Sequence, residues 1–120
     1  MRQRADFEAW LQAYVAAWDS NDRHEIAALF TEDAEYYTAP FRQPWRGRNK
    51  IVEGWLQRRD EPGDHSFRYE VIALDGDLGV VRGWTRYKDA EATRFSHLWL
   101  IRLGSDGLAS SFTEWWMQEG

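Results

Sequence analysis

The chain has 120 residues and a formal net charge of −5; 43% of its residues are hydrophobic and 29% are charged. This length predicts one domain, residues 1–120, that is large enough to bury a sizeable core. The negative charge argues against nucleic acid or an anionic membrane as the main partner, because those surfaces are themselves negative. The sequence has no cysteine, which excludes disulfides and cysteine-ligated zinc and is typical of a reducing compartment.

The first 30 residues predict two helices. Apolar side chains from Phe7 to Trp18 recur at helical spacing, so residues 5–19 should form a helix with one buried face, and a second helix should cover about 22–30. Charges are spread through the first eight residues, which is unlike a signal peptide, and no apolar run approaches the roughly 18 residues of a membrane span. We therefore expect a cytoplasmic protein without a membrane partner.

The rest of the chain changes from helix to strand. Residues 31–40 should be extended, with Tyr36 and Thr38 on one face, and a third helix should follow at 48–60. Turn signals at 74–78, 88–92 and 103–108 then separate four strand-like segments, which predicts an antiparallel meander. Helices followed by a meander indicate an α+β fold in which three N-terminal helices cover one face of a curved sheet.

The last hairpin places a carboxylate among aromatic rings. If its turn pairs Leu103 with Leu108, Glu114 lies opposite His97, Phe112 opposite Trp99, and Trp116 opposite Phe95. His97 can donate to Glu114 or carry the opposite charge, and either lowers the cost of burying the carboxylate. The two residues are a candidate acid–base pair at the floor of a pocket, or a structural cross-strand pair.

The neighbouring strand and the other face of the hairpin suggest two further contacts. Arg82, Trp84 and Arg86 alternate along one face of their strand, and if that face is the His97 face, an arginine could balance the charge of Glu114. The opposite face of the last hairpin is also too apolar for water; it carries Leu98, Leu100, Thr113, Trp115 and Met117. Because three helices can cover only one face, we expect a homodimer through the outer face of the sheet.

Several segments together resemble the nuclear-transport-factor-2-like superfamily, and more narrowly its SnoaL-like members. They are "YVAAWDSNDRHEIAALFTEDAEYY", "PWRGRNKIVEGW", the meander and the ending "FTEWW". The resemblance implies a cone, in which a strongly curved, mixed and mostly antiparallel sheet wraps three helices and opens at one end to a hydrophobic pocket. It also implies that the Arg82, Trp84 and Arg86 face lies inside the cone, and that the protein is a dimer through the sheet.

Within that superfamily, ketosteroid isomerases have a similar layout. Tyr14 falls on the position of their oxyanion-hole tyrosine, whereas Thr38 replaces the proton-shuttling aspartate and Trp99 replaces the protonated acid. Steroid isomerisation by that mechanism is therefore disfavoured. Asp19 and His65 fall near an aspartate and a histidine that scytalone dehydratases pair.

These observations predict a pocket protein that binds a small hydrophobic or cyclic molecule. The alternative is a cofactor-independent enzyme that isomerises, dehydrates, cyclises or hydrolyses its substrate by proton transfer. The candidate catalytic residues are His97, Glu114 and Tyr14, and the candidate substrate-binding residues are Tyr36, Thr38, Arg82, Trp84, Arg86, Trp99, Phe112 and Trp116. No cofactor or metal site is expected. The cations between Arg42 and Lys50 could form a solvated rim or receive an anionic ligand.

Overall fold

The structure is a computed structural model that describes residues 3–61 and 63–119. This part of the chain contains three helices and six strands. The helices are α1 (Arg4–Ser20), α2 (Arg23–Ala27) and α3 (Arg48–Gln57). The strands are β1 (Phe30–Tyr37), β2 (Trp45–Arg46), β3 (His65–Asp75), β4 (Leu78–Tyr87), β5 (Arg94–Leu103) and β6 (Ala109–Gln118).

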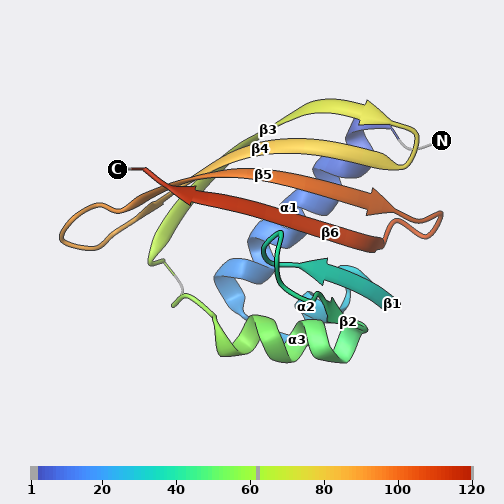
Figure 1. Ribbon diagram of the computed structural model, residues 1–120, viewed down its shortest axis with the longest axis horizontal. Helices are drawn as coiled ribbons and strands as arrows, with labels where there is room; N and C mark the ends of the chain where they lie inside the picture. Colours follow the sequence, from blue (N-terminus) through green and yellow to red (C-terminus); the bar gives the residue numbers. More distant parts are fainter. Residues whose placement is uncertain (1–2, 62, 120) are drawn as a thin grey trace.

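The strands form one sheet in the order β2-β1-β6-β5-β4-β3. All neighbours are antiparallel except β1 and β6, which are parallel, so the sheet is mixed. Helix α1 lies behind the sheet, and α3 lies beside β1 and β2 (Figure 1). The predicted α+β class with three helices is therefore confirmed. Helix α2 is shorter than predicted because Phe30 already begins β1, where it pairs with Ala109 of β6.

The core lies between α1 and the concave face of the sheet. Helix α1 buries one stripe, which includes Phe7, Leu11 and Tyr14, as its 3.6-residue periodicity predicts. From the sheet, Trp99 and Phe112 are almost completely buried against this stripe. Each large apolar side chain buried here stabilises the fold by about 1.5–3 kcal/mol. No helix of the described residues is long and apolar enough to cross a membrane.

The register of the β5–β6 hairpin differs from the predicted one by two residues. Leu103 pairs with Ala109 rather than Leu108, and a bulge then adds one more residue on β6. As a result Trp99, not His97, lies directly opposite Glu114. Two shifts of one residue leave the facing of alternate side chains unchanged. The predicted inward face therefore holds from Phe112 to Trp116, although its cross-strand pairs were wrong.

Strand β4 faces the opposite way from the prediction. Gly83 pairs with His97 and Val81 with Trp99, so these residues share the inner face. The alternate positions, Arg82, Trp84 and Arg86, lie on the outer face. There Arg82 pairs with Leu98 and forms a salt bridge with Glu70, and Arg68 lies over the Trp84 ring. The prediction that an arginine of β4 balances Glu114 is therefore wrong.

Candidate active site

A cavity of about 260 Å³ lies between α1, the end of α3 and the inner face of the sheet. Its wall is mostly aromatic, and polar and charged side chains also line it. The residues that line it are Tyr14, Trp18, Tyr36, Thr38, Trp45, Trp55, Arg58, Arg59, Asp60, Tyr87, Phe95, His97, Glu114 and Trp116.

Two buried tyrosines meet in the wall of the cavity. The hydroxyls of Tyr14 on α1 and Tyr36 on β1 lie 2.8 Å apart and share a hydrogen bond. Burial raises the pKa of each phenol well above 10, and the Glu114 carboxylate raises both further. Both phenols are therefore neutral at physiological pH. One hydroxyl must donate to the other, which leaves the second O–H of the pair to donate to a bound molecule.

His97 and Glu114 meet on the inner face of the last hairpin, as the sequence predicts, but diagonally. His97 Nδ1 lies 3.4 Å from Glu114 Oε2, and Nε2 lies 2.7 Å from the Thr85 hydroxyl. A bare Nδ1 lone pair would face a carboxylate lone pair, so the geometry favours a proton on Nδ1. In the neutral imidazole Nε2 then accepts from Thr85. No hydrogen bond is formed at Nδ1 by the described residues.

Glu114 is held mainly by a tryptophan. The indole N–H of Trp99 donates to Glu114 Oε2 over 3.1 Å, directly across the strand pair. A charge-assisted bond of this kind offsets much of the desolvation cost of the carboxylate, whose side chain is 19% exposed. Oε1, the second oxygen, has no hydrogen-bond partner among the described residues. Glu114 can therefore accept a hydrogen bond or a proton from a molecule in the cavity.

A second carboxylate lies at the other side of the cavity. Asp60 follows α3, and its Oδ2 accepts from the Trp18 indole at 2.9 Å and from the Tyr87 hydroxyl at 3.0 Å. The side-chain amide of Asn21 donates to the Asp60 backbone carbonyl over 2.6 Å. Asn21 also ends α1 in the left-handed conformation that asparagine tolerates. The end of α1 thus fixes the position of Asp60.

His65 lies close to this carboxylate, behind Trp18. Its ring stacks on the Trp18 ring with 4.0 Å between centroids, and its Nδ1 is buried without a hydrogen-bond partner among the described residues. Burial lowers the pKa of His65, whereas Asp60 and Asp19 oppose that shift. Asp19 does not bond to His65: its carboxylate accepts from the Gly63 backbone N–H at 3.0 Å. The two residues suggested by the scytalone dehydratase resemblance are therefore neighbours and not a bonded pair.

The predicted site residues fall into three groups. Tyr14, Tyr36, Thr38, His97, Glu114 and Trp116 line the cavity. Trp99 and Phe112 are 1% and 0% exposed, so they lie in the core behind the wall. Arg82, Trp84 and Arg86 lie on the outer face of the sheet, away from the cavity, which corrects their expected placement.

Several lining residues were missed in the sequence. Asp60 lies in a segment that reads only as a helix stop, and Trp18 reads as one more apolar position of α1. Tyr87, and Thr85 that contacts His97 behind the wall, alternate with the β4 arginines, so a correct facing of β4 would have found both. The hydrogen bonds from Trp18 and Tyr87 to Asp60 join segments 42 and 27 residues apart in the chain, which no local pattern encodes.

The basic segment between β1 and α3 is partly occupied by structural contacts. Arg46 pairs with Glu35 at 3.4 Å, and Arg48 donates to the Phe30 carbonyl. Within the described residues no three histidine or acidic side chains gather in a way that could hold a metal ion.

Known proteins share this architecture. The chain resembles an NTF-2 like protein of unknown function from Burkholderia xenovorans LB400, with 14% identity, a TM-score of 0.75, and coverage of 97% of this chain and 86% of that one. A candidate ketosteroid isomerase from Kribbella flavida DSM 17836 gives 23% identity, a TM-score of 0.72, and coverage of 97% and 81%. A ketosteroid isomerase-like protein from Erwinia carotovora atroseptica SCRI1043 has 22% identity and a TM-score of 0.66, and the match covers 92% of both chains.

At these identities the likeness shows the fold alone. No curated protein matches the chain. A family model, described as the SnoaL-like domain, matches residues 11–112, which is most of the sequence. The chain therefore belongs to the SnoaL-like domain family.

Proposed function

We propose that the protein binds a small, largely apolar cyclic molecule in the cavity. The supporting observation is that the aromatic wall encloses polar groups from three places, namely the Tyr14–Tyr36 hydroxyl pair, Glu114 and Asp60. Apolar walls with a few convergent polar groups are typical of small-molecule sites. The volume of about 260 Å³ is just below the usual range for drug-sized ligands, which favours a molecule of one or two rings.

The alternative is a cofactor-independent enzyme that works by proton transfer. It is favoured by the position of Glu114, which lines the same cavity as the neutral tyrosine pair and keeps one carboxylate oxygen without a hydrogen-bond partner among the described residues. Here His97 and Glu114 would exchange the proton, and the Tyr14–Tyr36 pair would donate to the ligand oxygen on which negative charge develops. Isomerisation, dehydration, cyclisation and hydrolysis all fit this arrangement.

Binding can be tested by titrating the protein with cyclic ketones, phenols and lactones while the NMR signals of His97 and the tryptophan indoles are followed. We expect ligands to shift signals of His97 and of Trp18, and to leave Trp115 on the outer face unchanged. The variant Tyr36→Phe should lower the affinity for oxygen-bearing ligands about tenfold, because it removes a hydrogen-bond donor. A panel that shifts no cavity signal would contradict the proposal.

Catalysis is tested on the ligands that bind. Glu114→Gln keeps the shape of the side chain and removes its basicity, so it should abolish turnover while binding changes only severalfold. The matched control is Glu70→Gln on the outer face, where the carboxylate pairs with Arg82. Equal turnover by Glu114→Gln and the parent protein would exclude the acid–base mechanism.

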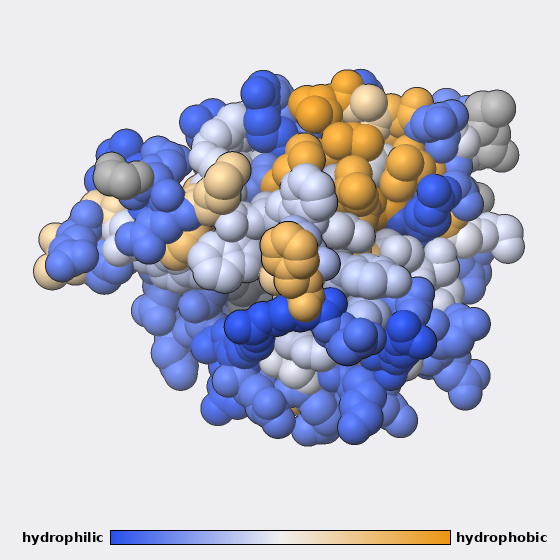
Figure 2. Space-filling model, in the orientation of Figure 1, coloured by the Kyte–Doolittle hydropathy of each residue, from blue (hydrophilic) through white to orange (hydrophobic). Residues whose placement is uncertain are grey.

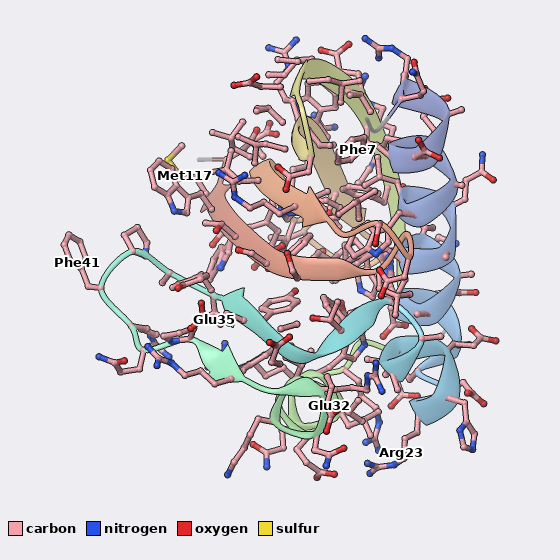
Figure 3. All side chains as sticks on the ribbon, turned by 90° about the vertical axis from the view of Figure 1, so that its right-hand side faces the viewer. Phe7, Arg23, Glu32, Glu35, Phe41 and Met117 are labelled. Atoms are coloured by element: carbon pink, nitrogen blue, oxygen red, sulfur yellow. The ribbon has the colours of Figure 1, made fainter. Side chains whose placement is uncertain are left out.

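We also propose that two copies associate through the outer face of the sheet. Hydrophobic side chains gather over strands β3 to β5 on this face (Figure 2), where Ile72 is 47% exposed. Trp115 and Met117 extend the apolar surface on β6 at 49% and 73% exposure, and Met117 projects from the molecule on the same side as Phe41 (Figure 3). An exposed apolar face of this kind is a common interaction surface.

The oligomeric state is measured by sedimentation equilibrium. We expect a dimer, and we expect Leu100→Glu to yield a folded monomer, because a charge would then be buried at the centre of the interface. Arg94→Glu, at the start of β5, serves as the charged control and should remain dimeric. A parent protein that is monomeric at all concentrations would rule out this association.

A further inference from the structure

The unused polar atoms of the cavity are mostly hydrogen-bond acceptors. Glu114 Oε2 is taken by Trp99, and Asp60 Oδ2 is taken by Trp18 and Tyr87. The other oxygen of each carboxylate has no hydrogen-bond partner among the described residues. The indole and phenol donors nearest to Asp60 are already used on it. A ligand that satisfies these oxygens must bring N–H or O–H groups of its own.

Two carboxylates and two arginines line the cavity, and the carboxylates are the more buried of the four. Within the described part of the chain, no arginine or lysine forms an ion pair with Asp60 or Glu114. Arg58 and Arg59 are exposed, so solvent screens their charges, although Arg58 still opposes the rise in the pKa of Tyr36. The carboxylates are more buried, so their field is screened less. The net charge of −5 on the whole chain acts in the same direction.

Aromatic faces around the cavity suit a cation. The rings that line it beside the tyrosine pair are Trp18, Trp45, Trp55, Tyr87, Phe95 and Trp116. Tryptophan faces bind cations best among the aromatic side chains. The Trp45 ring already contacts a cation, because the Arg58 guanidinium lies 5.5 Å from its centroid.

His97 provides an independent sign that this is a ligand site. It lines the cavity and is only 9% exposed, and yet its Nδ1 forms no hydrogen bond with the described residues. Nδ1 lies 3.4 Å from Glu114 Oε2 without forming a hydrogen bond, so this buried polar atom is incompletely satisfied, and a ligand-binding role is one explanation. Acceptors, negative charge and aromatic faces thus surround one cavity.

We infer that the cavity selects a ring-bearing ammonium, that is, an aromatic or alicyclic amine whose charge is bound by Asp60 and Glu114 and whose ring packs among the tryptophans. This inference rests on the proposed small-molecule function and names the chemical class of the ligand. A protonated amine supplies the N–H donors that the two free carboxylate oxygens lack, and its charge is attracted to the ring faces. A carboxylate of the same shape would meet like charge and unmatched acceptors.

The test uses three probes with one ring system: 2-naphthylmethylammonium, 2-naphthylmethanol and 2-naphthoate. Their dissociation constants are measured by calorimetry at pH 7. We expect the ammonium to bind about tenfold more tightly than the alcohol, and the naphthoate to bind most weakly. Asp60→Asn and Glu114→Gln should each remove most of the advantage of the ammonium while leaving the affinity for the alcohol within about twofold.

Two controls separate the cavity from the charge of the whole protein. Glu70→Gln removes one negative charge from the outer face and should leave all three affinities unchanged. Arg58→Gln should leave the preference for the ammonium intact. Equal affinity for the ammonium and the alcohol would overturn the inference and leave the proposed function standing. The same holds if the naphthoate binds most tightly and Arg58→Gln abolishes its binding. Failure of all three probes to bind would overturn both.

Discussion

Trp99 and Glu114 face each other across β5 and β6, and the indole N–H donates to the carboxylate over 3.1 Å. This contact explains how a carboxylate can lie within the most aromatic part of the chain. An unpaired buried charge would cost several kcal/mol or become neutral. Here the Trp99 indole donates a hydrogen bond to the Glu114 carboxylate, and the His97 imidazole lies 3.4 Å from it, so an arginine is not required.

The first prediction concerns this bond. Trp99→Phe keeps an aromatic ring in the core and removes the N–H donor from Glu114. Together with the loss of volume at a side chain that is 1% exposed, this should lower the free energy of unfolding by about 2–4 kcal/mol. Urea denaturation followed by far-UV circular dichroism measures it.

The matched control is Trp115→Phe. Trp115 is the neighbour of Glu114 on the outer face and is 49% exposed, so the monomer should lose no more than about 0.5 kcal/mol. Introducing Glu114→Gln into Trp99→Phe should recover part of the loss, because a neutral amide costs less to leave unpaired. No coupling between the two substitutions would argue against the contact.

The inner face of this hairpin could be predicted from the sequence although its register could not. Alternation along a strand decides which residues share a face, and it survives any shift by two. The exact pairs depend on how many residues the turn and the bulge absorb. The Gly104 N–H donates to the Leu108 carbonyl, which moves the first pair to Leu103 and Ala109, and the bulge after Ala109 adds the second shift.

The sequence could not predict which face of β4 points inward, for a different reason. Both of its faces carry large side chains, with Trp84 on one and Tyr87 on the other, so the pattern does not decide which is inside. The turn between β4 and β5 sets it by pairing Arg86 with Arg94. Helices α1 and α3, in contrast, followed from longer apolar periodicities that a single residue cannot disturb.

The second prediction concerns the tyrosine pair. Tyr14→Phe and Tyr36→Phe each leave one buried hydroxyl without its partner, so each should cost about 1–2 kcal/mol of unfolding free energy. The double variant should cost less than the sum of the two, with a coupling of about 0.5–1.5 kcal/mol. Chemical denaturation of the parent protein, the two single variants and the double variant measures this coupling as a double-mutant cycle. Strict additivity would mean that the two hydroxyls do not depend on each other.

The third prediction concerns acid stability. Burial lowers the pKa of His65 below its usual 6.5 in the folded protein, so the unfolded chain takes up the proton first. The stability that neutral His65 contributes is present above pH 6.5 and is lost as the pH falls through and below that value. His65→Phe keeps a ring stacked on Trp18 and removes the titration. We expect the parent protein to lose more stability than His65→Phe between pH 7.5 and 5.

Two measurements check this prediction together. Unfolding free energies over that pH range compare the two proteins, and an NMR titration gives the midpoint of His65 directly. The carboxylates of Asp60, Asp19 and Asp64 oppose the effect of burial and Lys88 adds to it. A midpoint above 6.5 would show that the acidic neighbours outweigh burial, and the two stability profiles would then diverge in the opposite sense.

The last prediction tests the facing of β4. A Cβ added at Gly83 would lie 2.6 Å from the Phe67 ring, which itself stacks on Trp99 with 5.0 Å between centroids. Gly83→Ala should therefore displace Phe67 and destabilise the protein by about 1–3 kcal/mol, as overpacking of a core does. Phe67→Leu should restore part of that loss when combined with it. Arg82→Ala, one residue away on the outer face, should cost less than about 1 kcal/mol, because its salt bridge with Glu70 is exposed to solvent. If instead Arg82→Ala were the costly change and Gly83→Ala the harmless one, β4 would face the other way, and Thr85 could not be the partner of His97.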